Sequence, residues 1–340
     1  MNILLTCAGR RNYLINYFKE ALKGTGKVIA TDMQISAPAM YDADIAEVVP
    51  SIYNKSYIIS LTEIIKKHKV KAIVSLNDLE LPILSRNKHK IEALGVNVII
   101  SSERVIDITF DKIKTARFLE SIGVKTPKTV STLEEAKLKI LTREYNFPLV
   151  VKPRWGSASI GIDFPEDEKE LELTFDLQHI KLKRSILNDV SQSDYENALL
   201  IQQKIEGKEY GMDILNDFSG NYIGTFVREK LAMRAGETDK AISIIDKRFE
   251  VIGKLISQNL KHIGNLDCDV LEKEGELYVL EMNARFGGGY PFSHEAGVNT
   301  PKIYIELLRG SNSFDSYINY QAGKLFSKCD RIITIDKDND

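Results

Sequence analysis

Acidic side chains recur at alternate positions in two neighbouring segments, 266–273 and 277–283. A hairpin turn centred on Gly275 places Asp269 opposite Glu281 and Asp267 opposite Asn283. Because strand side chains alternate between faces, these four polar residues share one face. The residues between them are apolar, so the pattern predicts half-buried carboxylates, and two carboxylates with an amide suit Mg²⁺. A solvated outer face of a sheet is the alternative.

A lysine closes the apolar run 148–151 and precedes a segment rich in glycine and serine, 156–161. Lys152 must either extend its ammonium group to water or meet an anion. Small residues let a backbone approach a ligand closely, and their N–H groups can cradle phosphate oxygens. The segment therefore predicts a phosphate-binding lid. It is not a Walker A loop, since no Gly-Lys-Ser/Thr follows, and an ordinary turn is the alternative.

Three weaker signals accompany these two. The strand-like run 199–203 ends in a polar segment, 204–209, whose backbone groups could pair with an adenine edge. Arg228, Lys230 and Arg234 predict a cationic wall, or an exposed sheet edge that carries charges. Three glycines at 287–289 follow Arg285 and fit either a close approach to a ligand or a flexible connector.

The elements that position these residues begin with a parallel sheet. Strands are expected at 3–6, 27–31, 72–75 and 96–100, with helices at 13–22, 58–68 and 81–94. This alternation is typical of a doubly wound α/β sheet. Its first turn, 7–12, has one glycine where a dinucleotide fingerprint has three. Asp78 and Glu80 follow a strand, where open α/β sheets place ligands, although a surface loop is an equal alternative.

Beyond residue 110 the pattern changes to an α+β arrangement. Helices are expected at 111–122, capped by Asp111, and at 133–144, 247–260 and 301–308. Strands are expected at 149–152, 198–203, 210–215 and 222–230, followed by the hairpin 266–282. We interpret the polar stretch 178–197 as an insertion or mobile connection, and 331–335 as a strand-like run.

Length and composition narrow the class of function. A chain of 340 residues is long enough for about two domains. The 46 Lys and Arg balance 48 Asp and Glu, so no global basic field favours nucleic acid. The apolar runs fall far short of the ~20 residues of a membrane span, and residues 2–11 do not read as a signal peptide. Three scattered cysteines form neither a disulfide framework nor a metal pair, so we expect a cytoplasmic protein.

In this order and spacing, the segments resemble the ATP-grasp superfamily, and most closely the carbamoyl-phosphate-synthetase-like branch of carboxylate–amine ligases. The resemblance rests on Asp111-Lys112, Lys152 with the loop 156–161, the segments 202–209 and 228–237, Asp269, and the Glu-x-Asn-x-Arg element at 281–285. It implies a pre-ATP-grasp domain over 1–105, a subdomain over 106–195 with the glycine-rich lid, a second over 196–310 with the Mg-ATP site, and an extension over 311–340.

The resemblance also implies roles for individual residues. ATP would contact Lys112, Lys152, Gly156, Ser157, Ser159, Gly161, Gln202, Gln203, Lys204, Ile205 and Glu209. Asp269, Glu281 and Asn283 would hold two Mg²⁺ ions, with Mn²⁺ as an alternative metal. The catalytic set would be Arg285, Lys152 and Arg234, and the substrate set Arg10, Asp78, Glu80, Arg234, Gly288 and Gly289.

The activity implied by the resemblance is an ATP-dependent ligation through an acyl phosphate. It would join an amino acid or other small carboxylate to an amine, with release of ADP and phosphate. From the sequence we expect none of the further domains of the synthetase or of biotin carboxylase, and this expectation disfavours their reactions. An ATP-grasp kinase or phosphoryl transferase, and a non-catalytic nucleotide-binding regulator, are the alternatives. Partners are expected to be small molecules, not nucleic acid or membranes, and a homodimer stays open.

Overall fold

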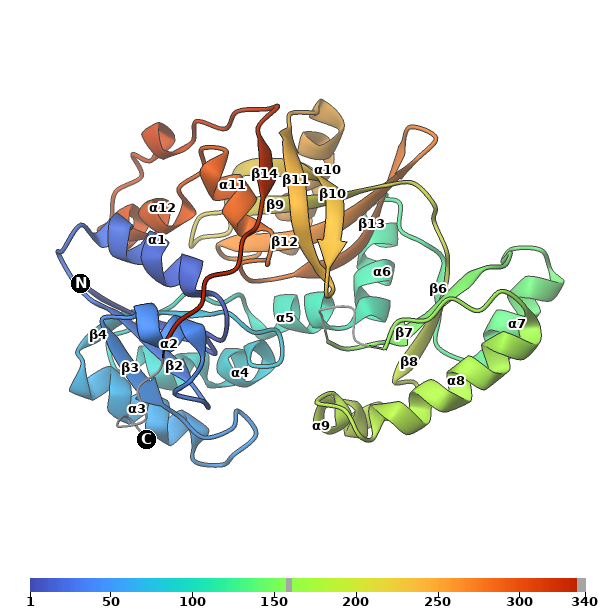
Figure 1. Cartoon of the computed structure of the whole chain (residues 1–340), viewed down its shortest axis with the longest axis horizontal. Coiled ribbons are helices and arrows are strands. Elements are labelled where there is room, and N and C mark those ends of the chain that lie inside the picture. The colour runs from blue at the N-terminus through green and yellow to red at the C-terminus, as the bar shows by residue number, and fades with distance from the viewer. Residues whose placement is uncertain (157–160, 335–340) are drawn as a thin grey trace.

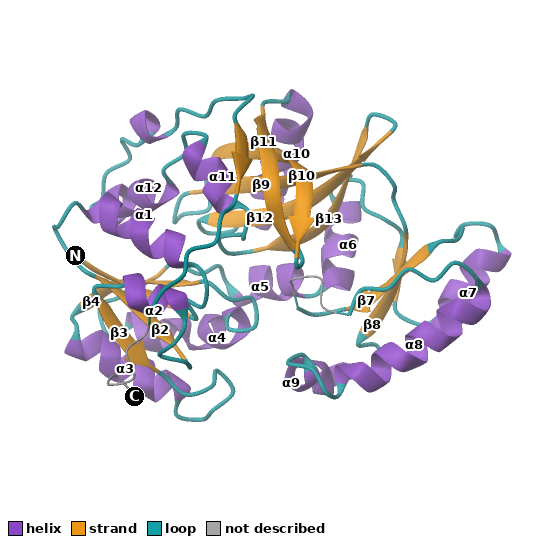
Figure 2. Ribbon diagram, in the orientation of Figure 1, coloured by secondary structure: helices purple, strands orange, loops and turns teal. Residues whose placement is uncertain are grey.

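A computed structural model of the chain describes residues 1–156 and 161–334 (Figure 1). Ser157 and Ser159, which the sequence places in the lid, lie outside the described residues. The strands form three sheets (Figure 2). None of the helices in these two stretches combines the length and the apolar character that a membrane crossing requires.

The N-terminal sheet has five parallel strands in the order β3-β2-β1-β4-β5. These are β1 (Asn2–Thr6), β2 (Val28–Asp32), β3 (Ile45–Val48), β4 (Val70–Ser75) and β5 (Asn97–Val98). Helices α1 (Asn12–Leu22) and α2 (Pro38–Asp42) pack on one face, and α3 (Tyr57–Lys67) and α4 (Leu81–Glu92) on the other. The predicted doubly wound sheet is confirmed. The strand order reverses between β1 and β4, so their carboxyl ends border the crevice that such sheets use for ligands.

Alternation along β1 divides the hydrophobic core into two layers. Ile3 and Leu5 pack with α1, whereas Leu4 packs with α3 and α4 on the opposite face. Both layers continue beyond this sheet. Tyr304 of α12 (Thr300–Leu308) joins the first layer, and Phe249 of α10 (Lys247–Leu260) joins the second. The N-terminal sheet and the later part of the chain therefore share their cores.

The second sheet has three antiparallel strands in the order β6-β8-β7: β6 (Thr129–Val130), β7 (Leu149–Pro153) and β8 (Leu199–Gln203). Helices α7 (Leu133–Leu141) and α8 (Glu168–Leu182) pack against it. The boundary expected from the sequence, between residues 195 and 196, would separate β8 from its sheet partners β6 and β7. We therefore propose that the boundary follows Gln203.

The stretch 178–197, interpreted from the sequence as an insertion or mobile connection, contains regular secondary structure. Helix α8 runs to Leu182, and α9 (Asn188–Ser191) and a 3₁₀ turn (Gln192–Asp194) follow it. The start of α8 is fixed by Asp167, whose side chain accepts a hydrogen bond from the Glu170 N–H. The apolar residues Leu173, Leu177 and Ile180 of α8 are exposed, which is why its sequence shows no clear helical period.

The third sheet has six antiparallel strands in the order β13-β12-β9-β10-β11-β14. They are β9 (Lys208–Asn216), β10 (Tyr222–Arg234), β11 (Glu237–Ile244), β12 (Asn265–Lys273), β13 (Glu276–Asn283) and β14 (Leu325–Ser327). Helix α10 covers one face and α11 (Tyr290–Glu295) packs on the other. The edge strand is β14 and not the predicted run 331–335, since residues 331–334 form no strand and 335 lies outside the described stretches.

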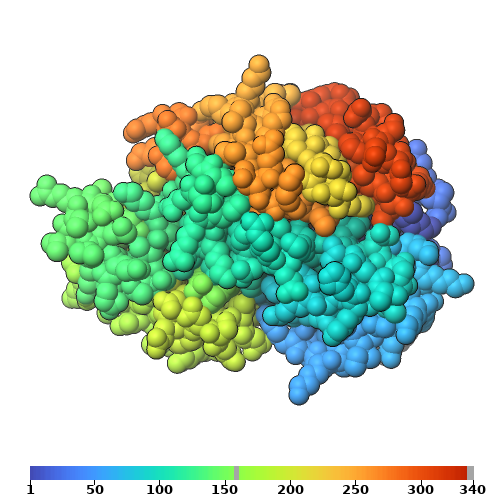
Figure 3. All heavy atoms as spheres, turned by 180° about the vertical axis from the view of Figure 1, so that it is seen from behind, coloured from blue at the N-terminus to red at the C-terminus, as the bar shows by residue number. Residues whose placement is uncertain are grey.

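Two helices join the sheets. Seen from behind, the teal segment that contains α5 (Glu103–Phe110) and α6 (Lys112–Ser121) occupies the middle of the molecule (Figure 3). Asp111 caps α6, as predicted, because its carboxylate accepts hydrogen bonds from the Ile113 and Lys114 N–H groups. The same carboxylate binds the Arg154 guanidinium at 2.6 and 2.9 Å, which ties α6 to the end of β7.

The register of the β12–β13 hairpin matches the sequence prediction at its polar end. Asp267 pairs with Asn283, and Asp269 pairs with Glu281. The turn itself consists of Glu274 and Gly275, both with positive φ, and is one residue shorter than a turn centred on Gly275. An irregularity between Asp269 and the next pair shifts the register by one residue and cancels that difference.

Candidate active site

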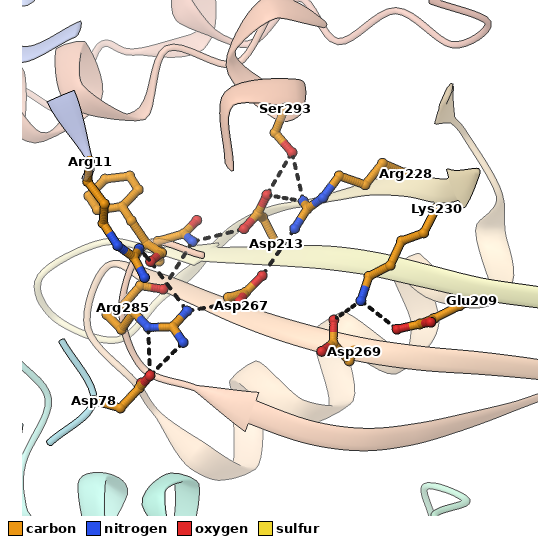
Figure 4. Close-up of polar contacts among 12 residues, drawn as sticks. Arg11, Asp78, Glu209, Asp213, Arg228, Lys230, Asp267, Asp269, Arg285 and Ser293 are labelled. Carbon is orange, nitrogen blue, oxygen red and sulfur yellow. Dashed lines mark hydrogen bonds and ion pairs between the residues drawn. The ribbon is translucent and has the colours of Figure 1, made fainter. Parts of the chain in front are cut away.

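Five buried charges alternate in sign across the third sheet and reach the N-terminal sheet (Figure 4). Arg228 on β10 donates to Asp213 at 2.6 Å and to Asp267 at 3.1 Å. Arg285, just after β13, donates to Asp267 at 2.9 Å and to Asp78, which follows β4, at 2.6 Å. Burial alone would lower the pKa of Arg285, but the charges of Asp78 and Asp267 outweigh it and raise the pKa. Both guanidinium groups therefore stay charged.

The three glycines at 287–289 make this network sterically compatible with the loop that covers it. A Cβ on Gly287 would lie 2.2 Å from the Asp267 carboxyl group, and one on Gly289 would lie 2.4 Å from the Arg228 guanidinium. A side chain at either position would displace a buried ion pair. The glycines thus permit a close approach to the chain's own charges, and the loop is more than a flexible connector.

A second cluster lies farther along the same strands (Figure 4). The Lys230 ammonium group donates to Glu209 at 2.6 Å and to Asp269 at 2.7 Å. Burial raises the pKa of Asp269, Lys230 lowers it, and the charge of Glu281 on the neighbouring strand raises it again, so that the net shift is upward. Because the Asp269 and Glu281 carboxylates repel each other, a further cation bound between them would be stabilised.

Two lysines face these carboxylates from the other side. The Lys112 ammonium donates to the Gly156 carbonyl at 2.5 Å and lies 3.8 Å from the Glu281 carboxylate. Lys152 is 7% exposed, and its burial lowers its pKa to about 8 although Glu281 acts in the opposite direction. A buried lysine in this state is poised to accept an anion. Both lysines line a pocket with Trp155, Gly156, Glu209, Asp269 and Glu281.

This pocket adjoins a second one, and the two share the lining residues Glu209, Asp269 and Glu281. The second pocket is lined by charged groups from both ends of the chain, including Arg11, Glu237 and Arg285. Asn283, which was predicted as a metal ligand, also lines it, together with Gly288 and Gly289, which were predicted as substrate contacts. We refer to these two adjoining pockets together as the cleft, which has lysines at one end and arginines at the other.

The residues expected near adenine lie on and after β8. Gln202 is buried, and its amide nitrogen donates to Thr129 at 2.7 Å. The Gln203 side chain is bonded to both backbone groups of Asn146, and its backbone N–H donates to the Lys128 carbonyl. Lys204 forms an ion pair with Glu206 at 3.0 Å. Ile205 follows in the extended connection to β9.

Neither residues 202–205 nor Asp78, which Arg285 binds, line the two pockets, and three further sequence-predicted residues lie elsewhere. Glu80 is fully buried beneath the carboxyl ends of β1 and β4, where Thr6, Ser75 and Tyr57 donate to its carboxylate. Arg10 is exposed and lies 3.9 Å from Asp330. Arg234 is an exposed residue at the end of β10, and Asp330 and Asp239 bind its guanidinium. None of the three lines the cleft among the residues that the structure describes.

Sequence reasoning missed several residues that line or support the cleft. Arg11 lines it where Arg10 was expected, because the turn after β1 directs the two neighbouring side chains differently. Asp213 stands alone among apolar residues in a buried strand, which is the signal that identifies a charge with a buried partner. Glu237 opens β11, a strand that the sequence did not predict.

The donor set at the carboxylate pair fits a hard divalent cation. Within 1–156 and 161–334, no group of three or more His, Cys, Asp or Glu side chains gathers closely enough to hold a metal ion unaided. Asp269 and Glu281 face each other across the hairpin with Asn283 next in line, which supplies oxygen ligands but leaves the shell incomplete. Mg²⁺ binds in this manner, because it takes one or two carboxylates and completes its shell with phosphate oxygens and water.

Comparison with known proteins agrees with this geometry. The ATP-grasp domain model matches residues 109–289, which is more than half of the chain. This chain belongs to the ATP-grasp family. A model of the PylC-like N-terminal domain matches residues 3–99 of the same ATP-grasp chain. The resemblance inferred from the sequence is therefore confirmed.

Relatives of this ATP-grasp protein include the carbamoyl phosphate synthase large chains of Campylobacter jejuni and Thermotoga neapolitana. Each is 26% identical, over 69% and 73% of this chain respectively, but the match covers 22% of either relative. The chain thus spans about a fifth of the length of these relatives. These relatives are named for carbamoyl phosphate synthesis, and the match shows similarity to part of each without assigning this chain their reaction.

Solved structures share the ATP-grasp fold over nearly the whole chain. The L-amino acid ligase from Bacillus licheniformis is 20% identical with a TM-score of 0.67, and the match covers 91% of this chain and 75% of the ligase. The N5-carboxyaminoimidazole synthetase from Staphylococcus aureus, solved with ADP, is 19% identical with the same TM-score and covers 92% of this chain and 78% of its own. At this identity the likeness establishes the fold alone.

Proposed function

We propose that this protein is an ATP-dependent ligase that joins an amino acid or another small carboxylate to an amine. The reaction would pass through an acyl phosphate and release ADP and phosphate. The observation that carries the proposal is that two adjoining pockets share the carboxylate pair Asp269 and Glu281, with two lysines in one pocket and Arg285 in the other. A nucleotide phosphate at the lysines and a carboxylate at the arginine would meet beside Asp269 and Glu281.

The lysines are the proposed phosphate ligands. Lys112 and Lys152 come from different elements and converge on one pocket with Glu281. Gly156 and Gly161 flank the lid segment, and Ser157 and Ser159 remain predicted phosphate contacts within it. Gln202, Gln203, Lys204 and Ile205 are the proposed adenine contacts, and Glu209 the ribose contact.

The carboxylates are the proposed metal ligands. Asp269, Glu281 and Asn283 would hold Mg²⁺, with Mn²⁺ as an alternative, together with the β- and γ-phosphates. Mg-ATP supplies an electrophilic γ-phosphoryl group. Arg285 would balance charge that develops beside it, since Asp78 and Asp267 hold its guanidinium in a fixed position. Arg234 would need a rearrangement to take part, because Asp330 binds it at the surface.

A kinase that releases a stable phosphorylated product is the second candidate, since the proposed residues up to that step are the same. A regulator that binds nucleotide without turnover is a third. The complete set of Asp269, Glu281, Asn283 and Arg285 in one cleft favours turnover over the regulator.

A homodimer remains a prediction, to be checked by light scattering after gel filtration.

One experiment separates the three candidates. The protein is incubated with Mg-ATP and pools of amino acids and amines, ADP and phosphate are measured, and products are identified by mass spectrometry. Equal amounts of phosphate and an amide product support the ligase. A stable phosphorylated product supports the kinase. ATP binding without turnover across all pools would support the regulator and overturn the proposed ligase.

A further inference from the structure

Two guanidinium groups meet at a single carbonyl oxygen at the arginine end of the cleft. Arg11 and Arg285 both donate to the backbone carbonyl of Phe286. Figure 4 shows the two guanidinium groups next to each other. Arg285 also binds two carboxylates, whereas no salt bridge of Arg11 occurs among the residues that the structure describes. Two cations held this closely favour an anion beside Arg11.

A carboxylate lies opposite on the rim of the same pocket. Glu237 lines the pocket with Arg11, and its carboxyl carbon lies 3.4 Å from the position of a Cβ on Gly288. Burial would raise the pKa of Glu237, but Lys328 and then Arg11 outweigh it, so the pKa is lowered and the group is ionised at neutral pH. The pocket therefore presents a positive and a negative group that are not partners of each other in a salt bridge.

The partner of Glu237 comes from the C-terminal segment. The Lys328 ammonium group lies 3.1 Å from the Glu237 carboxylate. Lys328 directly follows β14, and its backbone N–H donates to the Asp239 carbonyl at 2.8 Å. Asp330 and Arg331 anchor the segment farther along, through Arg234 and Asp42. An ammonium group is thus held against Glu237 by the chain itself.

Tyr13, at the start of α1, adds a hydroxyl group to the same region. Burial raises the pKa of Tyr13, and the charges of Arg11, Glu237 and Arg285 also act on this hydroxyl. The hydroxyl group therefore lies within the combined field of the two arginines and Glu237.

We propose that Arg11 and Glu237 form a subsite for a zwitterionic amino acid. Arg11 binds the carboxylate, Glu237 binds the ammonium group, and Lys328 takes the place of that ammonium group in the ligand-free chain. The subsite deepens the proposed ligase function, on which its role in turnover rests. Its ligand class follows from the presence of one anion-binding and one cation-binding group in the lining of a single pocket.

Direct binding tests the subsite without turnover. The twenty L-amino acids are titrated one by one into the full chain by calorimetry, with the non-hydrolysable ATP analogue AMP-PNP and Mg²⁺ present. For each amino acid that binds, the corresponding des-amino acid and decarboxylated amine are titrated as well. We expect the zwitterion to bind at least about tenfold more tightly than either analogue, because each loses one charge-assisted contact. Equal binding of the des-amino acid would overturn the role of Glu237.

Substitutions test which residue binds the carboxylate and which binds the ammonium group of the amino acid. We expect R11A to weaken amino-acid binding about 10- to 100-fold and E237Q to remove the preference over the des-amino acid. K328A removes the competing ammonium group, so binding should tighten by a few fold. R309A, on the exposed end of α12, is the matched control and should bind as wild type. An equal loss in R10A and R11A, or unchanged binding in both R11A and E237Q, would overturn the subsite.

Failure of the subsite and failure of the ligase can be told apart. Amino-acid binding that depends on Arg11 and Glu237 without amide formation would leave the subsite intact and contradict the ligase. Ligation by R11A and E237Q with an unchanged KM for the amino acid would leave the proposed ligase function intact and contradict the subsite. Circular dichroism spectra and melting temperatures of all variants establish that the fold is retained.

Discussion

The Arg285 guanidinium binds the Asp78 carboxylate at 2.6 and 3.1 Å, although 207 positions separate the two residues in the chain. The contact joins the loop after β13 to the carboxyl end of β4, at the crevice of the N-terminal sheet. Both side chains are buried, so the bond lies in a medium of low dielectric constant. It fixes the residue proposed to act beside the phosphoryl group.

We expect D78N to reduce stability and turnover together. Loss of the charge leaves Arg285 buried with one carboxylate, which should lower the free energy of unfolding by about 3 kcal/mol. Urea denaturation measures this change. D107N is the control, because Asp107 forms an exposed pair with Lys114 and should change stability by less than about 1 kcal/mol. Equal effects of the two substitutions would contradict the role of Asp78.

We expect E281Q to abolish ATP turnover while the fold is retained. The substitution keeps the shape of the side chain but removes one charge of the proposed metal site. Phosphate release and the dependence of ATP binding on Mg²⁺ are the measurements. E276Q, at the exposed start of the same strand, serves as the control. Full turnover in E281Q would show that Glu281 does not hold the metal.

We expect ATP binding to depend on pH because Lys152 titrates within the accessible pH range. The lysine has a pKa of about 8 in the ligand-free protein, and phosphate groups favour its charged form. Below pH 8 it is already charged, so affinity should change little. Above pH 8 binding must take up a proton, and Kd should rise by up to about tenfold per pH unit. Calorimetry from pH 7 to 9.5 measures this dependence.

K152R supplies the comparison for that experiment. Arginine stays protonated throughout this pH range, so the variant should show no proton uptake linked to this position. A slope of the same size in both proteins would exclude Lys152 as its origin.

We expect G289A to destabilise the protein by about 1–3 kcal/mol, since the added methyl group overlaps the Arg228 guanidinium. The matched control is G288A, whose Cβ would make an ordinary contact at 3.4 Å with Glu237. Thermal unfolding of both variants tests the expectation. Equal melting temperatures would show that the loop can move aside from the buried charges.

The sequence predicted the parallel sheet and the hairpin pairing, because both rest on local periodicity, whereas for Lys152 it left open whether the ammonium group reaches water or meets an anion. The pairing of Asp269 with Glu281 held because the shorter turn and the register shift compensate each other. Which of two neighbouring arginines faces the cleft depends on the turn after β1, and this cannot be read from residue types. The burial of Glu80 depends likewise on Tyr57, a partner 23 positions away on another helix.

The shared cores of the first and third sheets have a consequence for recombination between relatives. Tyr304 and its neighbours on α12 close the layer that Ile3 and Leu5 begin, so the N-terminal unit includes a helix from the far end of the chain. A chimera that exchanged residues 1–105 alone would pack a foreign α1 against the α12 of this chain, so the side chains of that layer would no longer match. To exchange substrate preference between relatives, a functional chimera would have to take α12 together with the N-terminal sheet.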